Sequence, residues 1–212
     1  MRKHSPTPPT ASVGSGVGRA TGFQLRGSDQ QGAANFDSAL KRNRAFAAAG
    51  GHEGAVVFPK LRLFVLTCLD PRVDPAHFLG LGLGDAMVIR NAGGRVTPEV
   101  INDVAFIGQL ADTVLRDGPL FEVAVIHHTQ CGTGALADDT FRGRFAERIG
   151  AEESTLRDHA VLDPAATVAR DVGRLRSAPA ISPRVTVSGH VYDVVTGLVE
   201  TVIPAPPRNP AT

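Results

Sequence analysis

The chain has 212 residues, of which 42% are hydrophobic, and its formal net charge is +1. This length and apolar content suit one domain, and the near-neutral charge argues against nucleic acid as a partner. No apolar run approaches the roughly 18 residues that a membrane-spanning helix needs, so no membrane partner is expected. The N-terminus lacks an apolar signal-peptide core, and two cysteines are too few for a disulfide framework, which together favour a cytoplasmic protein.

Residues 1–35 are rich in Gly, Ser, Pro, Thr and Gln and contain few large apolar side chains. This composition predicts a flexible tail, because it cannot bury enough surface to offset the entropy lost on ordering. A leader or an overlong gene start is an alternative interpretation. The folded domain is expected over residues 36–205, and it begins with a predicted amphipathic helix over 36–49.

Two short apolar runs come next along the chain. They are "LRLFVLTC" (61–68) and "DAMVIRN" (85–91), and both are nearly continuous in apolar residues. Such runs are typical of strands that are buried on both faces of a parallel sheet.

The following segment, residues 97–117, predicts a long helix with Thr97 as its N-cap and Pro98 in its first position. Its buried face is expected to comprise Ile101, Val104, Ile107, Leu110 and Val114. A third apolar run, "FEVAVIHH" (121–128), predicts another buried strand, and residues 134–150 predict one further amphipathic helix.

The last third of the chain adds a helix over 163–177 and then, over 184–203, a strand, a Thr-Gly turn and a second strand. Alternation of strands and helices is typical of an α/β fold. We therefore expect a single domain with a mainly parallel central β-sheet flanked by helices and preceded by an N-terminal helical arm.

Unusual sequences follow each of the three predicted buried strands. They are "CLDPR" (68–72), "RNAGGR" (90–95) and "HHTQCGTG" (127–134). Ligands of open α/β sheets bind in the crevice beyond the carboxyl ends of the strands. The three loops therefore predict one common site.

Cys68, His128 and Cys131 are residue types that bind zinc. Two thiolates and one imidazole leave a fourth position open, as in a catalytic Cys₂His site. His128 and Cys131 can be presented by one turn, and Cys68 would come from a neighbouring strand end. A cysteine taken alone is more often a small core residue, and a redox dithiol is the other alternative, although redox pairs are usually C-x-x-C in one turn.

The ordered set C-x-D-x-R, R-N-A-G and H-x-x-C-G resembles the β-class carbonic anhydrases, whose relatives include carbonyl sulfide and carbon disulfide hydrolases. The closing "SGHVYDVVTG" resembles the last strand region of that family, and the likeness runs from about residue 36 to 203. His127 stands where the family often has Gly, and Gly94 stands where it often has Asn. With no Trp in the chain, the Trp-lined bicarbonate pocket of some members is not expected here.

The resemblance implies a Zn²⁺ ion held by Cys68, His128 and Cys131, and reversible hydration of CO₂ to bicarbonate by zinc-bound hydroxide. Asp70 would accept a hydrogen bond from the hydroxide and relay its proton. Arg72 would keep Asp70 ionised and off the metal. Without Arg72, Asp70 could close onto zinc as a fourth ligand.

The substrate pocket is expected to involve Asn91, Ala92, Gly93 and Gly132, since glycines allow close backbone approach. The turn after Cys131 would lead into the next helix, whose N-terminal amides would stabilise an anionic product.

The resemblance, together with the 36–49 helix, which could pack across a partner, implies a homodimer or a higher even oligomer. Two other functions stay open: hydrolysis of carbonyl sulfide or carbon disulfide on the same zinc scaffold, and a non-catalytic zinc or redox module. Asp70 and Arg72 argue against the module, because structural zinc needs a permanent fourth protein ligand.

Overall fold

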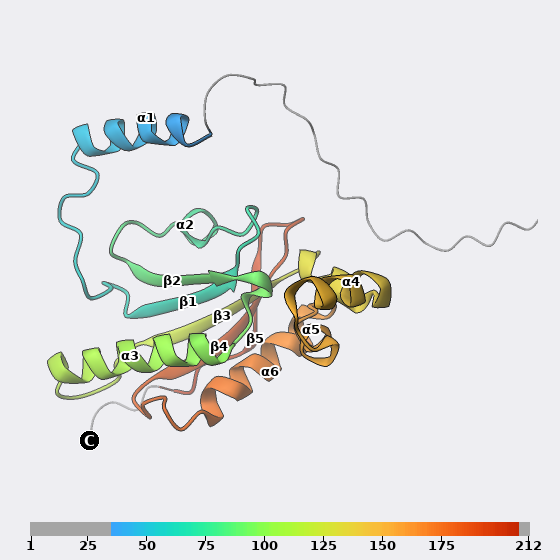
Figure 1. Ribbon diagram of the computed structural model, residues 1–212. Coiled ribbons are helices and arrows are strands. Elements are labelled where there is room, and N and C mark those ends of the chain that lie inside the picture. Colours follow the sequence, from blue (N-terminus) through green and yellow to red (C-terminus); the bar gives the residue numbers. More distant parts are fainter. Residues whose placement is uncertain (1–34, 208–212) are drawn as a thin grey trace, which may run out of the picture. The chain divides into compact units, whose positions relative to one another are not determined.

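The computed structural model describes residues 35–207, so the predicted tail lies outside the described residues except for its last position. The chain divides into two units, residues 1–51 and 52–212, and each is described by itself. The elements, in chain order, are α1 (Asn35–Ala48), β1 (Leu63–Cys68), α2 (Pro75–Phe78), β2 (Ala86–Asn91), the 3₁₀ helix η1 (Ala92–Gly94), α3 (Pro98–Val114), β3 (Glu122–His128), the 3₁₀ helix η2 (Gly132–Ala137), α4 (Asp139–Ile149), α5 (Glu153–Asp158), α6 (Pro164–Ser177), β4 (Thr186–Tyr192) and β5 (Val199–Ile203) (Figure 1).

The first unit contains α1, which matches the predicted 36–49 helix to within one residue at each end. It ends at a glycine pair: Gly50 has a φ of 68°, and the Gly51 amide donates to the Phe46 carbonyl at 3.0 Å. Left-handed glycines of this kind are common helix stops, because they lack the Cβ that would clash.

The second unit is built on a five-stranded sheet of order β2-β1-β3-β4-β5. The first four strands are parallel, and β5 pairs antiparallel with β4, which confirms the predicted α/β fold. β1 and β3 lie inside the sheet and are buried on both faces as predicted. That expectation is wrong for β2: it is an edge strand, and Val88 is 44% exposed.

Helices cover the two faces of the sheet unequally. Phe64 and Leu66 of β1 point into the main core, which also contains Val104 of α3 and Val172 of α6. The opposite face, with Val65, packs against short α2. Figure 1 shows α3 and α6 together on one side of the sheet and α2 on the other. Over residues 35–207, none of the helices combines the length and the apolar character needed to cross a membrane.

Helix α3 begins at the predicted residue, but the face that it buries differs from the predicted face. Thr97 caps it by accepting a hydrogen bond from the Val100 amide at 3.4 Å. Leu110 and Val114, expected to be buried, are 41% and 56% exposed. The buried positions are Val100, Val104, Gly108 and Ala111. Small residues at 108 and 111 let the helix approach the sheet on that side, which turns Leu110 and Val114 toward solvent.

The predicted helix over 134–150 is two elements. The 3₁₀ helix η2 ends at Ala137, and the side chain of Asp138 then caps α4 by accepting a hydrogen bond from the Phe141 amide at 2.7 Å. An Asx cap of this kind competes with continuation of the preceding helix. The segment after Cys131 is therefore a short 3₁₀ helix and not the start of the long helix that was expected to stabilise a product anion.

Candidate metal centre

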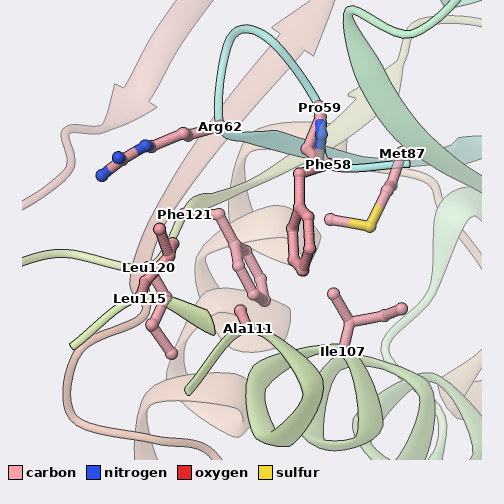
Figure 2. Close-up of a pocket in the computed structure, with 9 residues that line it drawn as sticks. All are labelled: Phe58, Pro59, Arg62, Met87, Ile107, Ala111, Leu115, Leu120 and Phe121. Carbon is pink, nitrogen blue, oxygen red and sulfur yellow. The ribbon is translucent and has the colours of Figure 1, made fainter. Parts of the chain in front are cut away.

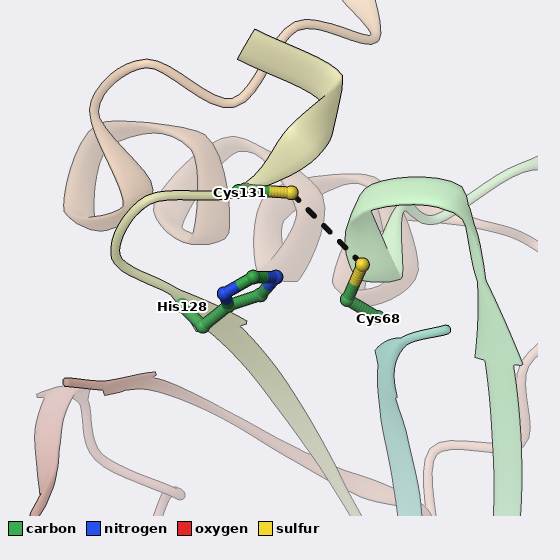
Figure 3. A group of neighbouring side chains, drawn as sticks. All are labelled: Cys68, His128 and Cys131. Atoms are coloured by element: carbon green, nitrogen blue, oxygen red, sulfur yellow. Dashed lines mark hydrogen bonds between the residues drawn. The ribbon is translucent and has the colours of Figure 1, made fainter. Parts of the chain in front are cut away.

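The ends of two adjacent strands bring two thiols and an imidazole together. Cys68 is the last residue of β1 and His128 the last residue of β3. Cys131 follows in the turn after β3, where Gln130 has a φ of 55°. The candidate ligand atoms of Cys68, His128 and Cys131 all lie within 4.8 Å of one another, and the two Sγ atoms are 3.9 Å apart (Figure 3).

The His128 ring presents an unshared nitrogen lone pair to the sulfurs. Its Nδ1 lies 2.9 Å from the Thr129 carbonyl oxygen, which can only accept, so Nδ1 carries the proton. Nε2 is buried and has no hydrogen-bond partner within the described part of the chain. A histidine whose second nitrogen donates to a carbonyl is the arrangement found around protein metal ions.

Each thiol also has a hydrogen-bond partner in its surroundings. The Gly93 amide donates to Cys68 Sγ at 3.3 Å, and the Thr133 hydroxyl lies 3.2 Å from Cys131 Sγ. Donation from the Cys131 thiol lowers the pKa of Cys68 although burial opposes this, and the same shared proton raises the pKa of Cys131.

Asp70 and Arg72 form a bidentate ion pair beside the thiols. Asp70 Oδ1 accepts from the Arg72 amide at 2.9 Å and from Nε at 3.0 Å, and Oδ2 accepts from Nη2 at 2.7 Å. Arg72 Nη2 also donates to the Gln130 carbonyl at 3.0 Å. These hydrogen bonds lower the pKa of Asp70, so its carboxylate stays ionised at neutral pH. Asp70 does not belong to the three-residue donor cluster found within the described residues.

Arg90 is a residue of this site that the sequence analysis did not single out, although it opens the "RNAGGR" loop. Its Nε donates to the Cys68 carbonyl at 3.0 Å and its Nη2 to the Asp70 carbonyl at 2.7 Å. The guanidinium therefore fixes the backbone that carries Cys68 and Asp70.

The four predicted substrate-pocket residues have different environments. Asn91 bonds across its own turn, with Nδ2 to the Arg95 carbonyl and Oδ1 to the Arg95 amide, both at 2.8 Å. Gly93 is buried against Cys68, whereas Ala92 and Gly132 are exposed. Gly93 is thus the member of this set that contacts a thiol.

Apolar side chains surround the two sulfurs. Val73 and Val161 are buried with Cys68 and Cys131 in one cluster. The partly buried residues that pack against this cluster are Phe78, Tyr192 and Val194. These side chains therefore form an apolar side of the site, opposed to the polar groups of Thr133, Asp70 and Arg72.

Two positions depart from the resembled pattern, and both have structural reasons. Gly94 has a φ of 65°, and a Cβ there would lie 2.9 Å from the Thr67 carbonyl carbon, so no larger residue fits. His127 is completely buried, with Nε2 3.1 Å from the Gly94 carbonyl oxygen and 3.3 Å from Asp171 Oδ2. This environment is that of a packed, hydrogen-bonded residue.

A cavity of about 180 Å³ lies at the other end of the sheet (Figure 2). It is lined by Phe58, Pro59, Arg62, Met87, Ile107, Ala111, Leu115, Leu120 and Phe121. Apolar side chains converge in it, while the Arg62 guanidinium points away and donates to the Pro119 carbonyl. None of the predicted site residues lines this cavity.

The donor set fits zinc. Two sulfurs and one imidazole nitrogen with a free lone pair are the ligands of a Cys₂His site that keeps a fourth position open. Softer thiolate ligands disfavour Mg²⁺ and Ca²⁺, which prefer oxygen.

Comparisons with known proteins agree with this chemistry. The family described as carbonic anhydrase matches residues 63–199. The chain is 31% identical over 157 residues to beta-carbonic anhydrase 1 of Mycobacterium tuberculosis, covering 74% of this chain and 91% of that protein. It is 30% identical over 158 residues to carbon disulfide hydrolase of Acidianus sp., covering 64% and 74%. A carbonic anhydrase structure from Streptococcus mutans superposes with a TM-score of 0.67 at 33% identity, covering 80% and 98%.

Proposed function

Because the chain belongs to the β-carbonic anhydrase family, we propose that it binds zinc through Cys68, His128 and Cys131 and catalyses the reversible hydration of CO₂ to bicarbonate. The observation that carries this proposal is the buried Nε2 of His128, which has no hydrogen-bond partner in the described structure and belongs to the same cluster as two thiols. An unsatisfied buried polar atom is costly unless a ligand satisfies it.

When bound, zinc would acidify a water at the open position so that the water can act as a nucleophile near neutral pH. The chain's own residues would handle the proton and the orientation. Asp70, ionised through its pairing with Arg72, would accept a hydrogen bond from the reacting water and take up its proton. Arg72, held also by the Gln130 carbonyl, would keep the Asp70 carboxylate directed away from the thiols.

The surroundings suit a small substrate without hydrogen-bonding groups of its own. Val73 and Val161 provide apolar walls, and the Gly93 amide provides a backbone donor next to Cys68. CO₂ is linear and nonpolar overall, so binding to apolar walls is compatible with its chemistry, and bicarbonate, being charged, would leave such a pocket readily.

Hydrolysis of carbonyl sulfide or carbon disulfide is the second candidate. The 30% identity to a carbon disulfide hydrolase supports it. Both substrates are linear and apolar like CO₂, so the same donors and the same Asp70–Arg72 pair would serve either reaction.

Stopped-flow CO₂ hydration by the zinc-loaded protein, run beside carbonyl sulfide and carbon disulfide assays, tests the proposal. We expect CO₂ to be the preferred substrate and about one zinc per chain. Cys68→Ser is the matched control and should lose most of the metal together with the activity. Turnover of carbon disulfide but not CO₂ would favour the second candidate, and full zinc occupancy in Cys68→Ser would contradict the ligand assignment.

The proposal includes an even oligomer, with a homodimer as its simplest form. Helix α1 supports it, because Phe36 is 69% exposed and Phe46 is 44% exposed on a helix among charged residues. Light scattering at micromolar concentration should give a mass of two or more chains, and the mass of a single chain would contradict this part.

A further inference from the structure

A buried carboxylate lies behind the candidate metal centre and takes no part in the proposed reaction. Asp171 of α6 is 0% exposed. Its Oδ2 accepts from Arg95 Nε at 2.7 Å and from the Val96 amide at 3.1 Å, and it lies 3.3 Å from His127 Nε2. Its Oδ1 accepts from Arg95 Nη2 at 3.2 Å and from Arg174 Nη1 at 2.9 Å.

These contacts join α6 to the turn that follows β2. Arg95 and Val96 end that turn, and both are bonded to Asp171. His127 completes the link, because its Nε2 lies near two acceptors, Asp171 Oδ2 and the Gly94 carbonyl, and must therefore carry the proton. One carboxylate thus fixes the end of the 92–95 turn through a side chain, a backbone amide and an imidazole.

The same turn contacts the thiol of Cys68. The Gly93 amide donates to Cys68 Sγ at 3.3 Å, and Gly94 approaches the backbone of Thr67 so closely that a Cβ would not fit. A shift of the turn by a few tenths of an ångström would therefore lengthen the amide–sulfur bond or press on the end of β1.

An amide that donates to a metal-bound thiolate withdraws electron density from the sulfur and orients it. We propose that Asp171 is a positioning residue for the metal centre, acting through Arg95, Val96 and His127 on the turn whose Gly93 amide donates to Cys68. The inference rests on the proposed zinc site. It adds a residue of α6 that is not one of the three donor residues.

Asp171→Asn tests this role, because it keeps the shape of the side chain and removes its charge. Zinc affinity is measured by competition with a chelator, and Co²⁺ replaces zinc so that the sulfur-to-metal absorption band reports on the thiolates. The amide proton resonance of Gly93, read by NMR, reports on the amide–sulfur bond. We expect a loss of zinc affinity of about 10- to 100-fold, a shifted absorption band and a moved Gly93 resonance.

Asp112→Asn is the matched control. Asp112 pairs with Arg184 through Nη1 at 2.5 Å, on the last turns of α3 and far from the thiols along the sheet. This variant should lose stability without moving the absorption band or the Gly93 resonance. If Asp171→Asn does not fold, Arg95→Lys is measured in the same way, since it keeps the positive charge but loses the bidentate geometry.

Wild-type zinc affinity, absorption band and Gly93 resonance in the folded variant would overturn the positioning role while leaving the zinc site intact. Equal changes in Asp112→Asn would overturn it too, because they would trace to general destabilisation. Failure of the wild-type protein to bind zinc would instead overturn the proposed function, and the positioning role with it.

Discussion

Two arginine–aspartate pairs flank the candidate metal centre. They differ in solvent exposure and in the sequence separation of the two paired residues. Asp70 and Arg72 are two residues apart in one loop, and their side chains are 13% and 48% exposed. Arg95 and Asp171 are 76 positions apart and 1% and 0% exposed. The first pair is partly accessible to solvent, whereas the second is enclosed by the fold.

The difference follows from what surrounds each carboxylate. Within the described part of the chain, the Asp70 carboxylate accepts hydrogen bonds from one residue, Arg72, through its side chain and its amide, so a small movement frees an oxygen. Asp171 receives hydrogen bonds from two guanidinium groups and a backbone amide, and any movement breaks several of them. The same kind of ion pair thus holds its carboxylate loosely in one place and rigidly in the other.

The largest expected effect comes from removing the buried carboxylate. Asp171→Ala leaves Arg95 buried without its main partner, and breaking a buried pair in this way costs about 3–5 kcal/mol in the free energy of unfolding. The matched change Asp70→Ala should cost about 1 kcal/mol or less, because the pair is partly solvated. Urea denaturation of the two variants measures both values, and equal losses would remove the distinction between the pairs.

For the rate of CO₂ hydration, the direct effect is expected from the Asp70–Arg72 pair, although this pair contributes less to the free energy of unfolding. Asp70→Asn and Arg72→Ala should keep zinc and each lose on the order of 10²-fold in CO₂ hydration, the usual scale for a positioned proton-transfer group. Arg72→Ala should also show a fourth protein oxygen at the metal by X-ray absorption, since Asp70 is then released. Near wild-type rates in both variants would show that this pair is only structural.

A smaller effect is expected from pH. Burial raises the pKa of Asp171, but the hydrogen bonds from His127 and Arg95 outweigh it and hold that pKa below its ordinary value of 3.8. A lowered pKa means that the charged form stabilises the fold: the contribution is complete above pH 3.8 and is lost as the pH falls toward the folded-state pKa. The stability difference between wild type and Asp171→Asn should therefore be constant near neutral pH and shrink below pH 3.8. A difference that grows on acidification would contradict the sign.

Local sequence patterns predicted the parts of the molecule that depend on neighbouring residues. The Thr97–Pro98 start of α3 follows from capping chemistry, and the meeting of Cys68 with His128 follows from their places at the ends of adjacent parallel strands. These features need only residue types, spacing and strand order.

Features that depend on distant packing were missed. Nothing in the sequence near Arg95 indicates that its partner is Asp171, because α6 must first dock on the sheet. The exposure of Leu110 likewise depends on how closely α3 approaches its neighbours, and the edge position of β2 depends on strand order. The periodicity of apolar residues shows that a helix has an apolar face. It does not show which residues of that face are most buried or which element they contact.

The strand order also sets when the metal centre can form during folding. Cys68 and Cys131 are 63 positions apart, and they meet only after β1 has paired with β3, with β2 and α3 lying between them in the chain. Closing so long a loop costs configurational entropy, so we expect this contact to form late in folding. Contacts that form after the rate-limiting barrier slow unfolding without accelerating refolding. A metal that joins Cys68 to Cys131 would therefore be expected to slow unfolding of the chain and to leave its folding rate unchanged.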